Sequence, residues 1–239
     1  FGVTLDVMTA VPAAEDDEMA RARLMVATRA ALVAGVDTEE IVRHGRQPVK
    51  EVIAAATAAD TNILIVGRRP ARGDIKEHLL GDTAAQIITQ AHCHVLIASW
   101  QSQMWRRRIL VVSDGSTDSD RIVEIAGQIA KTTRTPVTLV AATTAGKGRG
   151  KAAEDLALKA AHIHIEGVEC DSRIVEGPPE QAIPAAAKDL GVDLVVIGYQ
   201  QSLGRGIADQ IIGSLDCAVL VVQSGAEAPQ IDSAVAKQS

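Results

Sequence analysis

An internal repeat constrains the fold of this chain more than any other feature of its sequence. Apolar runs that contain a glycine occur at 63–69 and 194–200, and each is followed by a second apolar run, at 93–98 and 217–222. The segment between the glycine and the second run is seven residues longer in the first copy. A repeat of this length within 239 residues predicts two structurally related modules.

Composition restricts how these modules are built and what they bind. The chain has one Phe, one Tyr and two Trp, so its core consists of Val, Ile, Leu and Ala, as is typical of parallel strands covered by helices. A net charge of −6 argues against nucleic acid as a partner. The sequence has no apolar run of about 18 residues and no signal-peptide pattern. We therefore expect a cytoplasmic protein without direct membrane insertion.

The second copy alternates strand and helix patterns. A helix follows the first strand, with Ser119 as a candidate N-cap and Ile122, Ile125 and Ile129 at helical spacing. Such alternation predicts right-handed crossovers and a parallel sheet. The expected strands are 109–113, 137–142, 168–175, 194–197 and 219–222.

The first copy matches the second from its second strand onward, with expected strands at 3–8, 40–44, 63–66 and 93–98. Nothing before Phe1 corresponds to residues 109–131. In the strand order 3-2-1-4-5, the absent strand is the central one, so we expect an interrupted sheet. Residues upstream of Phe1, or another chain, would fill the gap.

Cysteine and histidine patterns indicate structural roles. Cys93, Cys170 and Cys217 lie in strand-like runs, and we expect three reduced, buried thiols. The histidine-containing segments 92–94 and 162–164 are interpreted as polar residues at the ends of helices. A zinc site is disfavoured because zinc needs three or four converging ligands. We therefore predict no metal site in either segment.

Four runs in a fixed order carry a resemblance to a known family. They are 109–116, 177–183, 193–198 and 217–222. With their partial repetition in the first half, they make the chain resemble a tandem universal stress protein. The resemblance divides the chain into a module lacking its first strand and helix (1–99), a linker (100–108), a complete module (109–223) and a tail (224–239).

This resemblance implies an α/β fold of two Rossmann-like modules, of the adenine nucleotide alpha hydrolase-like type. Each module has a parallel five-stranded sheet flanked by helices. The last strands of the two modules are expected to pair across their interface, forming an intramolecular pseudo-dimer. A homodimer of the whole chain is a further expectation.

Nucleotide-binding members of the family carry an Asp after the first strand. They also carry the loop Gly-x2-Gly-x9-Gly-Ser/Thr after the fourth, where glycines and a helix N-terminus approach the phosphates. The second module retains only part of this pattern, with Gln201 in place of the second glycine. By resemblance, its candidate nucleotide-binding residues are Asp114, Gly115, Ser116, Gly198, Gly204 and Gly206.

The first module retains a weaker set of the same elements. Pro70 replaces the second glycine, and Asp82 stands where the family has Ser or Thr. A carboxylate at this helix N-terminus is a good cap, but it occupies the site of an anion. The weaker candidates of this module are Gly67, Arg68, Gly81 and Thr83.

The resemblance implies a regulatory, stress-response protein that binds an adenine nucleotide such as ATP or AMP in its second module, with Mg²⁺ as a companion ion. Because no catalytic base is evident, we expect at most slow ATP hydrolysis and assign no catalytic residue. The alternative is a degenerate module that binds no nucleotide and acts through a protein partner. In that case the chain could be the cytosolic regulatory domain of a transporter.

Overall fold

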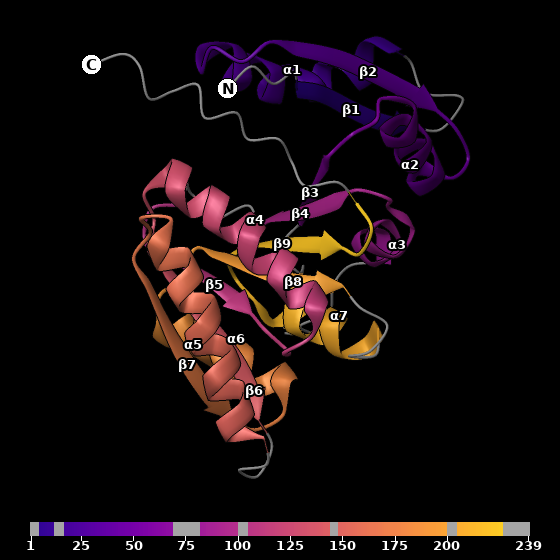
Figure 1. Ribbon diagram of the computed structural model, residues 1–239. Helices are drawn as coiled ribbons and strands as arrows, with labels where there is room; N and C mark the ends of the chain where they lie inside the picture. The colour runs from indigo at the N-terminus through magenta and orange to yellow at the C-terminus, as the bar shows by residue number, and fades with distance from the viewer. Residues whose placement is uncertain are drawn as a thin grey trace. The chain divides into compact units, whose positions relative to one another are not determined.

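The computed structural model describes residues 5–11, 17–68, 82–99, 105–143, 148–199 and 205–226. They belong to two compact units (Figure 1). The described residues of unit 1 end at Thr61, and those of unit 2 begin at Asn62. The boundary between the units therefore lies inside the first repeat, and the last two strands of that repeat belong to unit 2.

Unit 1 is a single βαβ crossover followed by a helix, with the elements β1 (Leu5–Val11), α1 (Asp17–Val33), β2 (Thr38–His44) and α2 (Pro48–Ala58). Its helix α1 begins at an acidic turn, which suits the positive end of a helix dipole. Leu24 and Ala31 are buried at helical spacing, whereas Met19 and Val26 are exposed. The strands β1 and β2 pair in parallel.

Unit 2 is built on a seven-stranded sheet with the order β3-β4-β9-β8-β5-β6-β7. Its elements are β3 (Ile63–Arg68), α3 (Asp82–Gln90), β4 (His94–Ser99), β5 (Ile109–Val112), α4 (Thr117–Thr133), β6 (Val137–Thr143), α5 (Arg149–Ile165), β7 (Cys170–Glu176), α6 (Pro179–Asp189), β8 (Leu194–Tyr199), α7 (Arg205–Ser214) and β9 (Ala218–Gln223).

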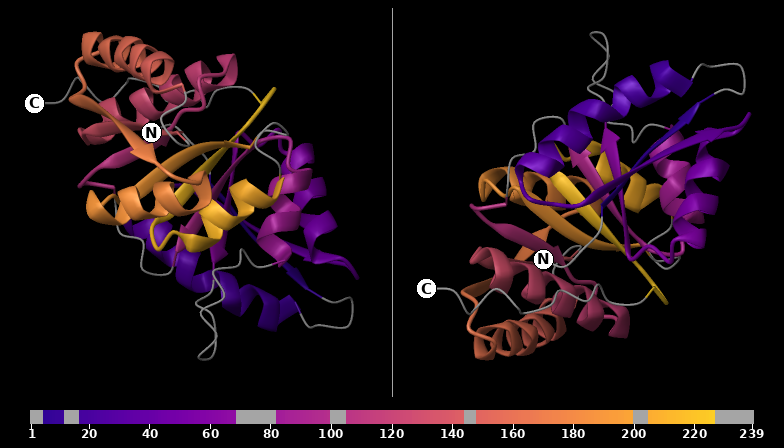
Figure 2. Two further views of the ribbon diagram at one scale, coloured as in Figure 1. Left: turned by 90° about the horizontal axis from the view of Figure 1, so that it is seen from below. Right: turned by 90° about the horizontal axis from the view of Figure 1, so that it is seen from above.

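The second module forms the larger part of this sheet. Its strands β5 to β9 pair in parallel in the order predicted from the sequence, with the first strand, β5, at the centre. Helices α4 and α5 cover one face, and α6 and α7 cover the other (Figure 2). The residues of β5 and β9 are all buried, which explains why these strands read as continuous apolar runs.

The two modules are joined through their last strands. β4 pairs antiparallel with β9, with Val95 opposite Val221 and Ile97 opposite Val219, as the resemblance implied. The strands of the first module form two separate pairs, β1–β2 and β3–β4, which confirms the predicted interruption of its sheet. Because β4 is antiparallel to β9, the carboxyl ends of β3 and β8 lie at opposite edges of the sheet.

A buried carboxylate fixes the amino ends of the two central strands. Asp193, which is 6% exposed, lies just before β8. Its Oδ2 accepts the backbone N–H groups of Arg106 at 2.9 Å and Arg107 at 3.0 Å, and its Oδ1 accepts that of Arg108 at 3.3 Å. These bonds hold the segment that leads into β5 against the start of β8.

The thiols differ in burial, and the prediction that all three are buried is wrong. Cys93 is buried, but Cys170 and Cys217 are partly exposed. Cys170 begins β7, the edge strand of the sheet, so only one side of the strand is covered by a neighbour.

We predict that Cys170 reacts slowly with thiol reagents near neutral pH despite its partial exposure. Partial burial, assisted by the adjacent Asp171 carboxylate, raises the pKa of Cys170 to about 11, and the thiolate is the reactive form. The alkylation rate at Cys170, followed by peptide mass spectrometry, should keep rising up to about pH 11. A rate that levels off near pH 8 to 9 would contradict this environment.

Candidate functional site

The candidate site of the second module is built around the turn between β5 and α4. Gly115 adopts a φ of +75°, a left-handed conformation that glycine accommodates without strain. Ser116 is the N-cap residue of α4, so the prediction of Ser119 as the cap is wrong. Ser119 lies in the first turn of the helix and is buried, with its hydroxyl directed at Asp114.

Asp114 is held by local donors through one of its carboxylate oxygens. Oδ1 accepts the backbone N–H of Ser116 at 2.9 Å and the hydroxyls of Ser116 and Ser119, both at 2.6 Å. Among the described residues, Oδ2 has no hydrogen-bond donor. The turn thus orients the carboxylate and leaves one oxygen able to accept a hydrogen bond from a ligand.

The same contacts keep Asp114 ionised. Partial burial would raise the pKa of this carboxyl, but the hydrogen bonds from Ser116, Ser119 and the backbone outweigh it and lower the pKa below its ordinary value. The stabilisation they provide is therefore present above the ordinary carboxyl pKa. It is lost as the pH falls through the lowered value.

A partly buried ionic cluster contacts Ser113, the residue that precedes this turn. The Lys159 side chain, 8% exposed, lies on α5, and its Nζ donates to both oxygens of Asp155 at 2.8 Å. It also donates to Ser113 Oγ at 3.3 Å. Ser113 directly precedes Asp114 and donates its hydroxyl to Asp155 at 3.2 Å. The cluster therefore ties the end of β5 to α5.

Gly198 lies next to this turn at the carboxyl edge of the sheet. β5 and β8 are parallel neighbours with Val111 opposite Val196, and continuing that register sets Gly198 beside Ser113. The strand order reverses between β5 and β8, which is where open α/β sheets bind ligands. The structure thus brings Asp114, Gly115, Ser116 and Gly198 to one edge of the sheet.

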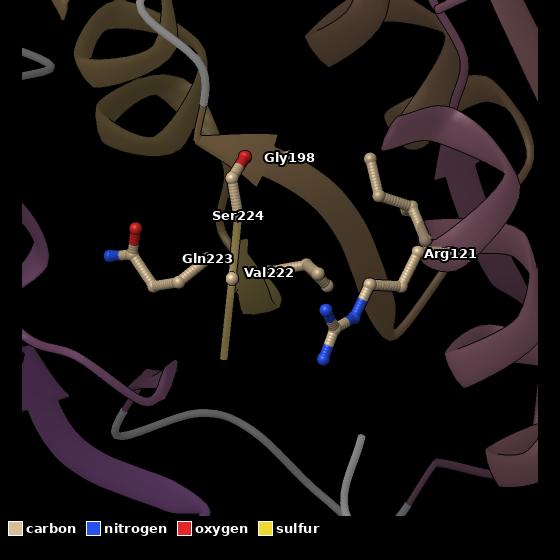
Figure 3. A pocket seen from close by; sticks show the side chains of 7 residues that line it. Arg121, Gly198, Val222, Gln223 and Ser224 are labelled. Carbon is tan, nitrogen blue, oxygen red and sulfur yellow. The ribbon is translucent and has the colours of Figure 1, made fainter. Parts of the chain in front are cut away.

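A hollow opens at the same edge, beside the ends of β8 and β9 (Figure 3). It holds about 260 Å³ of empty space, part of it open to solvent. Gly198 and the last residues of β9 line one side, and Arg121 of α4 lines the other. Sequence patterns do not single out Arg121, because an arginine on an amphipathic helix ordinarily points to solvent.

The remaining predicted residues are dispersed. Gly206 lies in the first turn of α7 and is exposed, whereas Gly204 is outside the described residues. In the first module, Gly67 and Arg68 end β3, at the opposite edge of the sheet from Asp114. Thr83 lies in the first turn of α3, and Gly81 is outside the described residues.

Comparison with known families decides the relationship of this chain. The model of the universal stress protein family matches residues 2–99 and again residues 106–223. The chain belongs to the universal stress protein family. It is a tandem member, with one match in each repeat. None of the curated proteins matches the chain.

Two solved structures are similar to this chain over most of its length. A protein of unknown function from Pseudomonas aeruginosa is 18% identical, with a TM-score of 0.72 over 93% of this chain and 83% of that one. A universal stress protein from Archaeoglobus fulgidus is 21% identical, with a TM-score of 0.68 over 92% and 86%.

A third similar structure belongs to a different kind of protein. The cytoplasmic domain of a prokaryotic cation chloride cotransporter is 14% identical, with a TM-score of 0.62 over 94% of this chain and 86% of that one. At these identities the likenesses establish the fold alone. Within the described part of this chain, no helix is both long and apolar enough to cross a membrane.

Proposed function

We propose that this universal stress protein binds an adenine nucleotide in its second module and acts as a regulatory binding protein. The site lies at the carboxyl edge of β5 and β8. The observation that carries the proposal is the juxtaposition of the Asp114 turn and Gly198 at the point where the strand order reverses. These are the two elements that nucleotide-binding members of the family carry at this place.

The contacts of Asp114 support a role toward the ribose of the nucleotide. Its Oδ1 is occupied by Ser116 and Ser119, so Oδ2 is oriented to accept a hydroxyl. A sugar hydroxyl is a neutral donor that suits an ionised carboxylate, whereas a phosphate would be repelled by it. Asp114 is therefore the proposed ribose contact, and the phosphate lies elsewhere in the site. Mg²⁺ is not part of this proposal.

The alternative function is an interaction module that binds no nucleotide. One sequence observation favours it: Gln201 stands where nucleotide-binding members of the family have the second glycine of the phosphate loop. In that case the chain would act through a protein partner, for example as the cytosolic part of a transporter. The likeness to the cotransporter domain is compatible with both functions, because it concerns the fold alone.

We predict that Asp114→Ala strongly weakens adenine nucleotide binding. The substitution deletes the oxygen assigned to the ribose and the acceptor that orders the turn, so binding of both AMP and ATP should weaken by about tenfold or more. Isothermal titration calorimetry of the full chain measures the effect.

Asp189→Ala is the matched control. It removes an exposed carboxylate at the end of α6 and should leave nucleotide affinity unchanged. Equal AMP affinity in the unmodified protein and in Asp114→Ala would exclude Asp114 from the site. The absence of binding in the unmodified protein would favour the interaction module.

A further inference from the structure

The hollow at the carboxyl edge has a chemical character that the predicted motif residues do not explain. Among the described residues that line it, Arg121 carries the only charge, and the rest are Ile122, Gly198 and the segment 222–225. None of these described lining residues carries a carboxylate. The charge that they present to the hollow is therefore positive, although the whole chain has a net charge of −6.

Arg121 is directed into this space. Its side chain extends from α4 toward the end of β9, where Val222 lies (Figure 3). The Nε atom is buried, and within the described part of the chain it has no hydrogen-bond acceptor. A buried donor on a charged group is costly to leave unpaired. The geometry therefore favours an anion that enters the hollow and accepts from the guanidinium.

The size of the hollow limits the anion. Its empty space of about 260 Å³ includes space that is open to solvent, so the enclosed part is much smaller. A small enclosed space favours a single phosphate group at the guanidinium over a longer polyphosphate.

We propose that Arg121 binds the phosphate of a nucleoside monophosphate whose ribose contacts Asp114. This inference rests on the proposed nucleotide-binding function and names the ligand class and the phosphate contact. A planar guanidinium can form two parallel hydrogen bonds to a phosphate. In nucleotide-binding members of the family, the glycine loop holds the phosphates. In this chain, Gln201 replaces the second glycine of that loop, and the Arg121 guanidinium takes over part of the loop's role.

Calorimetric titrations of the full chain with AMP and with adenosine test this assignment. Arg121→Gln should weaken AMP binding by about 10- to 100-fold and leave adenosine binding unchanged. Asp114→Ala should weaken both ligands, because both carry the ribose. Arg173→Gln removes the same charge from an exposed position on the edge strand β7 and should change neither affinity.

The outcomes separate the two proposals. If AMP binds equally well to Arg121→Gln and to the unmodified protein, the phosphate assignment is overturned while nucleotide binding stands. If Arg121→Gln weakens AMP and adenosine to the same extent, Arg121 shapes the site and does not contact phosphate. If neither ligand binds the unmodified protein at millimolar concentration, the proposed function fails, and this inference fails with it.

Discussion

Asp193→Ala is expected to destabilise the protein by about 3 kcal/mol or more, because hydrogen bonds to a charged acceptor each contribute about 1.5 to 3 kcal/mol. The Asp193 carboxylate accepts three consecutive backbone N–H groups, from Arg106 to Arg108. The Asp193 side chain is only 8% exposed, so water compensates poorly for the lost acceptors. The damage falls on the start of β5, the central strand of the sheet.

Circular dichroism measures this effect as a melting temperature. For a chain of this size, a loss of about 3 kcal/mol lowers the melting temperature by roughly 6 to 12 °C. Asp189→Ala is the control, since it removes an exposed carboxylate from α6 and should change stability by no more than about 0.5 kcal/mol. Equal melting temperatures for the two variants would show that Asp193 does not anchor the strand.

Lys159→Met is expected to cost about 3 kcal/mol, because removing one partner of a buried ion pair leaves the other charge uncompensated. Here two charges remain: Asp155, whose side chain is 29% exposed, and the more exposed Asp120, whose Oδ1 lies 3.4 Å from Lys159 Nζ. Ser113, beside the Asp114 turn, also loses a donor. Lys131→Met is the control, because both side chains of the Lys131–Glu166 pair are exposed and such pairs contribute little to stability.

A double variant separates ion pairing from packing. Replacing both members of a buried ion pair with apolar residues is often close to neutral. Lys159→Met combined with Asp155→Leu should therefore regain at least half of the stability that Lys159→Met loses. Asp155→Leu alone is measured as well. If the stability losses of Lys159→Met and Asp155→Leu simply add in the double variant, the stabilisation by Lys159 does not come from its contact with Asp155.

The topology of the second module could be predicted because its central strands are buried on both faces. Such strands read as uninterrupted apolar runs, as in Leu194–Tyr199, and the alternation with helices fixes their direction and order. The interruption of the first sheet was also predictable, from the absence of a counterpart of β5. The first residue of α4 was harder to predict, because the segment around 114–116 contains several residues able to cap that helix.

The charged residues that matter most could not be predicted. Charged residue types are usually found at the surface, and the roles of Asp193, Lys159 and Arg121 depend on neighbours far away in the sequence. Arg121 lines a hollow with Val222, about a hundred residues later in the chain. A carboxylate that accepts three backbone N–H groups, or a lysine that contacts the end of a strand, produces no periodic pattern in the sequence. Only the folded chain brings these groups together.

Binding of an adenine nucleotide by the second module can be tested by identifying the small molecules that the protein carries. Freshly purified full-length chain is denatured, and the released small molecules are identified and quantified by mass spectrometry. We expect near-stoichiometric adenine nucleotide, with AMP as the main species, and a marked loss in Asp114→Ala. No nucleotide in the purified protein, and none retained after incubation with millimolar AMP or ATP, would contradict this expectation.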